Sequence, residues 1–501
     1  MIIGKVLAQR ALVSPEREAL IFKDKIFTYR QLNQRANRLA NALIKLGVKP
    51  GERVGLLMYN CNEFLETYFA VIKIGAILVP LNTRLAAPEL DFILEDCGVT
   101  DFIFGQAFEE IILEMKCPGQ ARHRISTGAT SVPDTLDYEE LISKSSEDEP
   151  NIPIKEDDLH VIMYTSGTTG RPKGAMLTHG NMYCGGIDMA LGLNYRHPDR
   201  CLLLAPLFHS GAITPFLGHV LRGITTILLE QFSPKETLKL IEKHKAKQLV
   251  GVTAIMQMLL REPDLDSYDL DSWKLAILPG SPLPYALIQE AHDRFGILCQ
   301  NLWGLTEMCG PGSFVREEDI LHKAESAGKP YFNVDIRIVG LEGEDLGLDT
   351  TGEIVVRGPN VMSGYWNRPE ATAATIKDGW LFTGDMGKFD KDGYLYIIDR
   401  RKDMILSGGE NIYPAEIERV IMEMPGVAET AVIGVPDEKW GEVPKVFLVK
   451  RGEAYPSKEE VIAYCRSKLA GYKVPKHIEY LDELPRNPSG KVLKKILRTI
   501  P

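Results

Sequence analysis

The chain has 501 residues, of which 45% are apolar and 25% are charged, and its formal net charge is −10. A chain of this length is too long for one hydrophobic core, so we expect a soluble globular protein of two or more domains. The acidic balance argues against nucleic-acid binding, which needs a basic surface.

The eight cysteines are scattered along the chain. They form no Cys-x-x-Cys pair and no cluster with histidine, so neither a disulfide scaffold nor a structural zinc site is predicted. Residues 1–16 lack the continuous apolar core of a secretory signal. The apolar run 70–81 is short and is interrupted by Lys73, so it does not predict a membrane span. We therefore expect a cytoplasmic protein, while peripheral membrane contact and the oligomeric state stay open.

The first clear element is an amphipathic helix. Thr28 to Gln31 has the form of a capping box, apolar residues then recur at helical spacing, and Gly47 supplies a stop. Short apolar runs alternate with helical stretches and predict strands at 54–58, 76–79 and 101–104. This alternation is typical of a parallel sheet covered by helices. Residues 121–157 are polar and acidic, which indicates a long surface connection.

Residues 164–174 form a loop rich in glycine and hydroxyl groups, Tyr-Thr-Ser-Gly-Thr-Thr-Gly-Arg-Pro-Lys-Gly, after the apolar run 159–164. Its glycines let backbone amides approach an anion, its hydroxyls donate hydrogen bonds, and Lys173 adds a positive charge. The Walker loop needs Gly-Lys-Ser/Thr at the start of a helix, whereas this lysine follows proline. The pattern thus predicts a phosphate-binding loop of another kind, against the alternative of a surface loop without a ligand.

Beyond this loop the alternation resumes and predicts a second sheet, with strands at 201–204, 225–229, 248–252 and 275–278. Ser233 to Glu236 opens a helix between two of these strands. Residues 334–398 then change to short β-rich runs with glycine and aspartate turns, and no helix is expected there. This region predicts a small β-barrel that completes the large domain.

The charged run Asp399 to Asp403 marks a domain boundary, which divides the chain into domains 1–401 and 402–501. In the second domain we expect helices at 414–424 and 457–469 and strands at 430–435 and 446–449. The predicted fold class is an α/β N-terminal domain, with two helix-covered sheets and a small β-barrel, followed by a small α+β C-terminal domain.

Three further segments accompany the phosphate loop: Asn301 to Glu307 (Asn-Leu-Trp-Gly-Leu-Thr-Glu), Thr383-Gly384-Asp385, and Pro485 to Lys491. In this order they resemble the motifs of the adenylate-forming acyl-CoA synthetase family, and the resemblance covers nearly the whole chain. In detail the chain is similar to bacterial fatty-acyl-CoA synthetases and aryl-acid CoA ligases. The resemblance implies a mobile C-terminal domain and the use of ATP, Mg2+ and coenzyme A.

Within this resemblance, the loop would hold the β- and γ-phosphates of ATP through Thr165, Ser166, Gly167, Thr168, Thr169, Gly170 and Lys173. Thr306 resembles the family's contact to the α-phosphate. Glu307 resembles its ligand for Mg2+, a hard cation that prefers carboxylate and phosphate oxygens. The structural alternative for an isolated Thr-Glu pair is a helix N-cap.

The nucleoside would lie between Trp303 and a second wall that resembles Gly280-Ser281-Pro282-Leu283, although a single tryptophan is usually a core residue. Asp385 and Arg400 resemble the pair that binds the ribose hydroxyls, since a carboxylate accepts and a guanidinium donates hydrogen bonds. Their structural alternatives are a turn residue and a solvated linker charge.

Lys491 ends a stiff turn ahead of a basic helix. It resembles the family's lysine that enters the active site from the small domain and stabilises the adenylation transition state. Lysine suits this role because its flexible stem carries a compact charge. The structural alternative is the start of a surface helix.

A second half-reaction would use other residues of the small domain. The resemblance implies a domain rotation about Lys402, after which Ser407 to Asn411 lines a tunnel for the pantetheine thiol. Gly408 and Gly409 would allow the narrow ligand to approach the backbone. The CoA nucleotide would contact Trp440 and Tyr472. The structural alternative is that both are packing residues.

The acyl group would enter a pocket with His209 at its mouth, although a histidine among apolar residues is equally a structural group. The resemblance adds Gly304 and Met308 to the substrate site, with Gly185 to Leu193 and Cys309 as small or apolar walls. The predicted activity is ATP-dependent conversion of a carboxylic acid to acyl-CoA through acyl-AMP, with release of AMP and pyrophosphate. The expected acid is a medium- or long-chain fatty acid. The alternatives are an aryl or alicyclic acid, transfer to a carrier protein, or a non-catalytic nucleotide-binding regulator.

Overall fold

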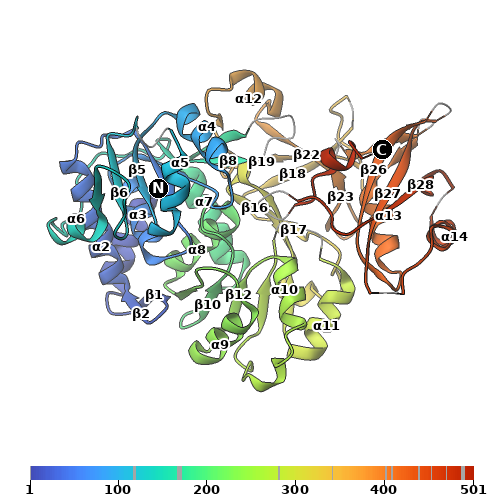
Figure 1. Cartoon of the computed structure of the whole chain (residues 1–501), viewed down its shortest axis with the longest axis horizontal. Helices are drawn as coiled ribbons and strands as arrows, with labels where there is room; N and C mark the ends of the chain where they lie inside the picture. The colour runs from blue at the N-terminus through green and yellow to red at the C-terminus, as the bar shows by residue number, and fades with distance from the viewer. Residues whose placement is uncertain are drawn as a thin grey trace. The chain divides into compact units, whose positions relative to one another are not determined.

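The structure is a computed structural model of the chain (Figure 1). It describes residues 2–116, 120–165, 172–279, 283–340, 342–400, 403–407, 410–437, 440–452, 454–469, 471–486 and 491–500. Contacts divide the chain into a large unit, Met1–Ile336 with Val356–Leu381, and a small unit, Arg337–Val355 with Phe382–Pro501. The predicted boundary at 401–402 lies outside the described residues and stays a prediction.

The first sheet of the large unit has eight strands in the order β20-β9-β8-β4-β3-β5-β6-β7. They are β3 (Arg53–Leu57), β4 (Ile77–Pro80), β5 (Val99–Phe104), β6 (His123–Ser126), β7 (Thr135–Asp137), β8 (Leu159–Thr165), β9 (Lys173–Thr178) and β20 (Gly364–Tyr365). The strands from β8 to β7 are parallel, whereas β8, β9 and β20 pair antiparallel. Because β3, β4 and β5 are apolar and almost fully buried, helices must cover both faces.

Helices pack on the first sheet. α4 (Ala87–Cys97) and α5 (Glu109–Glu114) contribute Leu90, Leu94 and Ile112 to a core that includes Val79 and Phe102 of the sheet. α2 (Tyr29–Lys45) packs against α3 (Asn62–Lys73) and α6 (Tyr138–Ser143).

The capping box of α2 is confirmed. The backbone amide of Gln31 donates to the hydroxyl of Thr28 at 3.2 Å, and the Thr28 amide donates to Gln31 Oε1 at 2.8 Å. The apolar face of the helix is buried, and the chain leaves it through Gly47 at φ +87°. The helix was predictable because both its signals, the cap and the spacing, are local.

The second sheet of the large unit has the order β14-β13-β12-β10-β11-β1-β2. Its strands are β1 (Glu18–Phe22), β2 (Lys25–Thr28), β10 (Arg200–Leu203), β11 (Thr225–Leu228), β12 (Gln248–Val250), β13 (Leu275–Ile277) and β14 (Leu298–Gln300). The four predicted strands are confirmed, and the N-terminal hairpin β1–β2 joins them at β11. The helices between and beside them are α1 (Ile3–Val13), α7 (His179–Gly192), α8 (Ser210–Arg222), α9 (Pro234–His244), α10 (Thr253–Leu260) and α11 (Tyr285–Phe295).

Two expectations for the secondary structure are wrong. Residues 121–157 are not only a surface connection, because they contain β6, β7 and α6 and extend the first sheet. These edge strands are three or four residues long and mix polar with apolar side chains, so they carry no clear period. The region 334–398 also contains a helix, α12 (Pro369–Thr375), which has no buried residue and therefore no apolar stripe to reveal it.

A short antiparallel sheet carries the Trp-Gly-Leu-Thr-Glu motif. Its strands are β15 (Leu302–Leu305), β16 (Gly310–Phe314) and β17 (Lys329–Pro330). The turn between β15 and β16 is a 3-10 helix, η4 (Thr306–Met308). Cys309 at φ +58° and Gly310 at φ +120° return the chain into β16, so Thr306 and Glu307 lie at the tip of this turn.

A five-stranded sheet, most of which belongs to the small unit, forms the expected β-rich region. It consists of β18 (Asp335–Val339), β19 (Gly352–Arg357), β21 (Ile376–Lys377), β22 (Trp380–Phe389) and β23 (Leu395–Arg400). The α+β part of the small unit contains α13 (Pro414–Met422), α14 (Lys458–Lys468), α15 (Lys494–Leu497), β24 (Ile405–Ser407), β25 (Glu410–Ile412), β26 (Val427–Asp437), β27 (Gly441–Lys450) and β28 (His477–Leu481). Ile417, Val446 and Val461 share its core. The two predicted helices and two predicted strands are confirmed, with strands longer than expected.

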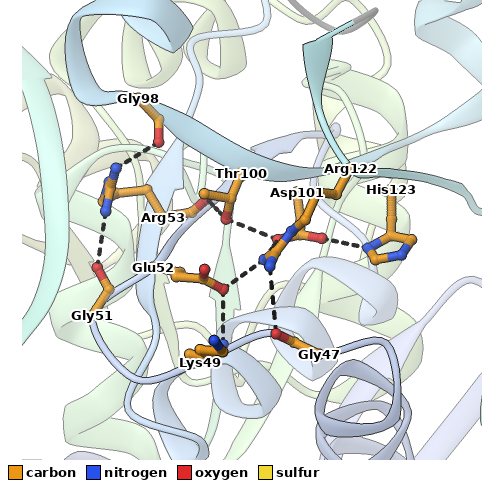
Figure 2. Close-up of polar contacts among 10 residues, drawn as sticks. All are labelled: Gly47, Lys49, Gly51, Glu52, Arg53, Gly98, Thr100, Asp101, Arg122 and His123. Carbon is orange, nitrogen blue, oxygen red and sulfur yellow. Dashed lines mark hydrogen bonds and ion pairs between the residues drawn. The ribbon is translucent and has the colours of Figure 1, made fainter.

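A polar cluster ties together the amino-terminal ends of β3, β5 and β6 (Figure 2). Asp101 is fully buried and accepts hydrogen bonds from Arg122 at 2.6 Å, His123 at 2.7 Å and Thr100 at 2.8 Å. Arg122 also donates to Glu52 at 2.5 Å. The cluster lies at the edge opposite to the carboxyl ends of the strands, where open α/β sheets bind ligands, so we interpret it as structural.

Among the described residues, no helix is both long and apolar enough to cross a membrane.

Candidate active site

The ends of the predicted phosphate loop lie opposite each other in an antiparallel hairpin. Thr165 ends β8, Lys173 begins β9, and the two residues are register partners. The Thr165 hydroxyl donates to the carbonyl oxygen of Lys173 at 3.5 Å. The loop therefore joins two strands and not a strand to a helix, which agrees with the argument against a Walker loop. Its remaining predicted ligands lie outside the described residues: Ser166, Gly167, Thr168, Thr169 and Gly170.

Residues 360–365, the last two of which form β20, hold Glu307 in position. The Tyr365 hydroxyl donates to Glu307 Oε1 at 2.9 Å, and the Met362 amide donates to the Glu307 carbonyl at 2.8 Å. Asn360 donates to the next carbonyl, that of Met308, at 3.2 Å. The backbone and carboxylate of Glu307 are thus positioned by residues more than fifty positions away in the sequence.

Tyr365 connects this motif to the hairpin. β20 pairs with β9, so Tyr365 lies opposite Ala175, and Lys173 Nζ lies 5.1 Å from the centre of the Tyr365 ring. Burial, together with the Glu307 carboxylate, raises the pKa of the Tyr365 hydroxyl, which therefore stays protonated as a donor. The sequence interpretation missed Tyr365. Nothing in the local pattern marks it, because its role depends on strand pairing between residues 190 positions apart.

The environment of Glu307 suits a magnesium ligand. Its side chain is half-buried, and Tyr365 is its one side-chain hydrogen-bond partner among the described residues. No group of three or more acidic, histidine or cysteine side chains in the described chain could hold a metal ion by itself. Mg2+ is commonly bound by one or two carboxylates together with substrate phosphates and water. The residues present therefore fit an ion that arrives with a nucleotide.

Thr306 contacts the first residue of α8. Ser210 Oγ and Thr306 Oγ1 are 3.5 Å apart, and His209 is the residue immediately before Ser210. The His209 ring lies 4.4 Å from the Phe208 ring, centre to centre. Burial, with a smaller contribution from Arg84, lowers the pKa of His209 to about 4, so the ring is neutral at physiological pH. His209 is thus brought close to the Thr-Glu motif, and its contact with substrate stays a prediction.

The predicted walls of the acyl pocket pack beside the same motif. A Cβ atom at Gly185 on α7 would lie 3.0 Å from Thr214 Cγ2 and 3.1 Å from the carbonyl oxygen of Cys309. Thr214 donates to that carbonyl oxygen at 2.6 Å. Met308 is fully buried. α7, α8 and the chain just after Glu307 therefore form one contact region.

Trp303 and Gly304 have structural reasons for their positions on β15. Trp303 is 8% exposed and packs, with Met308, against Gly312. A Cβ atom at Gly304 would collide with the carbonyl oxygen of Gly310 across a β-bulge, so the close strand approach requires glycine there. Their roles toward adenine and substrate stay predictions, and Gly280, Ser281 and Pro282 lie outside the described residues.

In the small unit, the predicted ribose pair is brought together. Asp385 on β22 and Arg400 on β23 are register partners, with Arg400 Nε 2.5 Å from Asp385 Oδ1. Asp385 is buried on a strand, and the Arg400 side chain is partly buried against it, so neither of the structural alternatives, a turn aspartate and a solvated arginine, describes this pair.

Lys491 is exposed and lies three residues before an anchored helix start. Lys494, at the beginning of α15, is 2.8 Å from Glu418. Although burial lowers the pKa of Lys494, Glu418 and Asp399 raise it to above its ordinary value. The sequence interpretation did not include Lys494, whose ion pair with Glu418 anchors the start of α15 three residues after Lys491.

The residues predicted to meet CoA are only partly described. Lys402, Gly408 and Gly409 lie outside the described residues. Trp440 and Tyr472 are each 42% exposed, with Lys476 Nζ 5.7 Å from the first ring and Lys473 Nζ 5.7 Å from the second. These two rings are not core residues, and each has a cation beside its face.

Comparison with known proteins places the chain in a family. Residues 7–366 match the model for the AMP-binding enzyme, and residues 416–491 match that for the AMP-binding enzyme C-terminal domain. The chain is 41% identical over 502 residues to a long-chain-fatty-acid–CoA ligase of Mycobacterium tuberculosis, covering 99% of this chain and 98% of that protein. It is also 41% identical over 498 residues to a feruloyl-CoA synthase from an Amycolatopsis species, with the same coverage.

A solved relative is the o-succinylbenzoate CoA synthetase of Bacillus subtilis in complex with its acyl-adenylate intermediate. It is 36% identical and covers 99% of this chain and 98% of its own, with a TM-score of 0.88. The motifs, their arrangement and these matches agree over almost the full length. The chain belongs to the AMP-binding enzyme family, as an ATP-dependent acyl-CoA synthetase that works through an acyl-AMP intermediate.

Proposed function

We propose that the enzyme activates a medium- or long-chain fatty acid, with an aryl acid as the second candidate. In the first half-reaction a carboxylate oxygen attacks the α-phosphorus of ATP, and pyrophosphate leaves. In the second, the CoA thiolate attacks the acyl carbonyl and AMP leaves. The observation that carries the proposal is the cluster of Lys173, Glu307 and Tyr365, which gathers a cation, a carboxylate and a hydroxyl donor at one position.

For the first half-reaction we assign Lys173 and Thr165 to the β- and γ-phosphates and Thr306 to the α-phosphate. Bound Mg2+ would neutralise charge on the phosphate oxygens. Glu307 would hold that ion through the carboxylate oxygen that Tyr365 leaves unbound, while the tyrosine fixes the orientation of the carboxylate. Asp385 and Arg400 would bind the ribose, and Lys491 would stabilise charge in the adenylation transition state.

For the second half-reaction we assign Gly408 and Gly409 to the pantetheine tunnel and Lys402 to the hinge. Trp440 and Tyr472 would stack on the CoA nucleotide. Their half-exposed rings and the neighbouring Lys476 and Lys473 support this, because stacking and cation pairing are what an adenine with phosphates requires.

Two equally similar relatives support the two substrate candidates, since one is named for a long-chain fatty acid and the other for ferulate. The small or apolar residues at Gly185, Met308 and Cys309 suit the hydrocarbon part of either acid. We place the enzyme in the cytoplasm, which is consistent with seven described cysteines that form no disulfide.

The test is pyrophosphate release with ATP, Mg2+ and a panel of fatty, benzoic and cyclohexanecarboxylic acids, each with and without CoA. Turnover that depends on CoA, with a fatty acid giving the highest kcat/KM, is the expected result. A benzoic or cinnamic acid at the top of the ranking would favour the second candidate. Lys491→Ala should then lose adenylate formation but keep thioester formation from supplied acyl-AMP. Equal loss of both would contradict the assignment of Lys491.

A further inference from the structure

Asp188, on α7, is a fully buried carboxylate without a partner. It is 0% exposed, and neither carboxylate oxygen accepts a hydrogen bond from a described residue. Asn333 lies close enough to favour the charged form and lower the pKa of Asp188, but it makes no hydrogen bond of normal geometry. Buried polar groups in folded proteins are nearly always satisfied, so an unsatisfied carboxylate calls for a partner that this structure does not contain.

The groups around Asp188 are also short of partners. Electrostatic contacts link it to Cys184 on its own helix, to Cys309 and to Tyr331. The Tyr331 hydroxyl and Asn333 Oδ1 have no hydrogen-bond partner either. No cation contributes to the pKa of Asp188, which burial raises to about 7. Several hydrogen-bonding groups therefore gather here without satisfying one another.

The position of Asp188 relates it to the reaction. Gly185 on α7 packs against Cys309, two residues after Glu307. Gly192, two turns further along the helix, packs against Tyr331. Residues at i, i+3 and i+7 share one face, so Asp188 lies between these contacts, about 4.5 Å along the helix axis from Gly185. This face of α7 runs from the Thr-Glu motif toward Tyr331.

We propose that Asp188 is a specificity-determining residue that binds a hydrogen-bond donor, a hydroxyl or an amino group, at the end of the acid remote from its carboxylate. The inference rests on the proposed function, because it needs the acid to extend from Glu307 along α7. A hydroxyl or amine would supply the missing partner. A purely hydrocarbon tail would instead leave the carboxylate buried against apolar atoms, and sites built around a hydrogen bond discriminate strongly against analogues that lack it.

The test compares matched acids that differ only at the remote end. One series pairs the C6 to C12 fatty acids with their ω-hydroxy and ω-amino counterparts. The other compares cinnamic acid with its 4-hydroxy, 4-amino and 4-methoxy derivatives, the last of which accepts but cannot donate. In the better-accepted series, wild-type kcat/KM should be higher for a donor acid by about tenfold or more. The hydroxy and amino members distinguish the two kinds of donor.

Variants locate the preference at Asp188. Asp188→Leu should abolish it, by lowering kcat/KM for the donor acid and raising it for the plain acid. Asp188→Asn keeps the volume and one acceptor oxygen, so it should retain a preference for the hydroxy acid and guards against misfolding of the leucine variant. The matched control is Thr214→Val, which removes a buried side chain to backbone hydrogen bond at the same contact region. It should leave the ratio within a pair unchanged, whatever its effect on overall rate.

A pH profile supplies a readout that a merely structural role would not change. As the Asp188 carboxyl loses its proton, its hydrogen bond to a donor becomes stronger. The ratio of kcat/KM for the donor acid to that for the plain acid should therefore rise between pH 6 and 8 in the wild type and should stay constant in Asp188→Asn. The neighbouring Cys184, Cys309 and Tyr331 do not titrate in this range, because the pKa of each is raised above its ordinary value.

The possible failures are distinguishable. If neither the matched acids nor the wider panel support turnover, the proposed function itself is wrong. If acids are turned over but wild type shows no preference, or if Asp188→Leu keeps the wild-type ratio, then the inference is overturned and ordered water satisfies Asp188 instead.

Discussion

Asp101 and Asp188 are both fully buried carboxylates of the large unit, but their surroundings are opposite. Asp101 accepts hydrogen bonds from Thr100 on its own strand, from His123 at the start of β6 and from Arg122 just before β6 (Figure 2). Asp188 accepts none from any described residue. A buried charge with a complete set of partners fixes strand register, whereas one without partners is unfavourable for folding and indicates a binding role.

Glu307 lies between these extremes. It is half-buried, and its described side-chain partner is a single neutral donor, Tyr365. The three carboxylates thus form a series from full to partial to no pairing. If pairing separates structural from functional acids, then removing each charge should affect stability and activity in different proportions.

The largest effect is expected at Glu307. Glu307→Gln keeps the acceptor for Tyr365 but removes the charge that would hold Mg2+, so adenylate formation should fall by about 10²- to 10³-fold. Pyrophosphate release at saturating ATP and Mg2+ measures this, with the thermal midpoint as the control for folding. A variant within threefold of wild type would exclude Glu307 from metal binding.

The next effect is on stability. Asp101→Asn offers one acceptor oxygen in place of two, so the groups that donate to the two carboxylate oxygens, Arg122, Thr100 and His123, can no longer all be satisfied. Arg122 also keeps only Glu52 as its acidic partner. The free energy of unfolding should therefore fall by about 3 kcal/mol. Activity at 25 °C should not change. The matched control is Asp134→Asn, which breaks an exposed ion pair with Arg124 on the same sheet and should cost almost nothing. Similar losses in both variants would show that burial of Asp101 contributes little.

How far the sequence predicts the molecule depends on the range of the interactions. The helix 29–45 could be located because Thr28, Gln31 and the apolar spacing act within a few residues. The edge strands β6 and β7 could not, since they are short and are held by contacts such as Arg122 to Asp101. Likewise, α12 has no buried face from which a period could arise.

The residues of the candidate site also fall into two groups, those marked by local motifs and those marked only by tertiary contacts. The resemblance could predict six residues one by one, because they belong to motifs with a fixed order: Thr165, Lys173, Thr306, Glu307, Asp385 and Arg400. Their roles stay predictions. Tyr365 belongs to no such motif, and Asp188 lies in the range 185–193, which the resemblance implies only as small or apolar walls of the acyl pocket. Tyr365 matters because β20 pairs with β9, and Asp188 because α7 packs on Cys309. Both facts are tertiary and leave no local signal.

The third effect concerns the pH dependence of stability. The pKa of Asp188 is raised by burial from 3.8 to about 7 in the folded protein, so the folded state holds a proton that the unfolded chain has lost. This contribution is complete below pH 4 and disappears as the pH rises through 7. Between pH 5.5 and 8, the free energy of unfolding of the wild type should therefore fall by about 2 kcal/mol relative to that of Asp188→Asn, in which residue 188 does not titrate. Denaturant titrations of both proteins at each pH measure the difference, and parallel curves would mean that Asp188 has a partner in solution.

The smallest effect tests the positioning of Glu307. Tyr365→Phe keeps the ring beside Lys173 but removes the hydroxyl that donates to Glu307. Loss of this hydrogen bond should cost about 1 kcal/mol, which corresponds to a rate of adenylation about fivefold lower. The loss should appear mainly as a higher Mg2+ requirement, because the carboxylate is less well oriented. Tyr138→Phe is the matched control, since Tyr138 donates to the buried Glu66 at 2.9 Å in a structural setting. That variant should lower stability and leave the Mg2+ requirement unchanged. If both variants shift the Mg2+ requirement equally, the hydrogen bond from Tyr365 does not position the carboxylate, and Glu307 would be oriented by its backbone contacts alone.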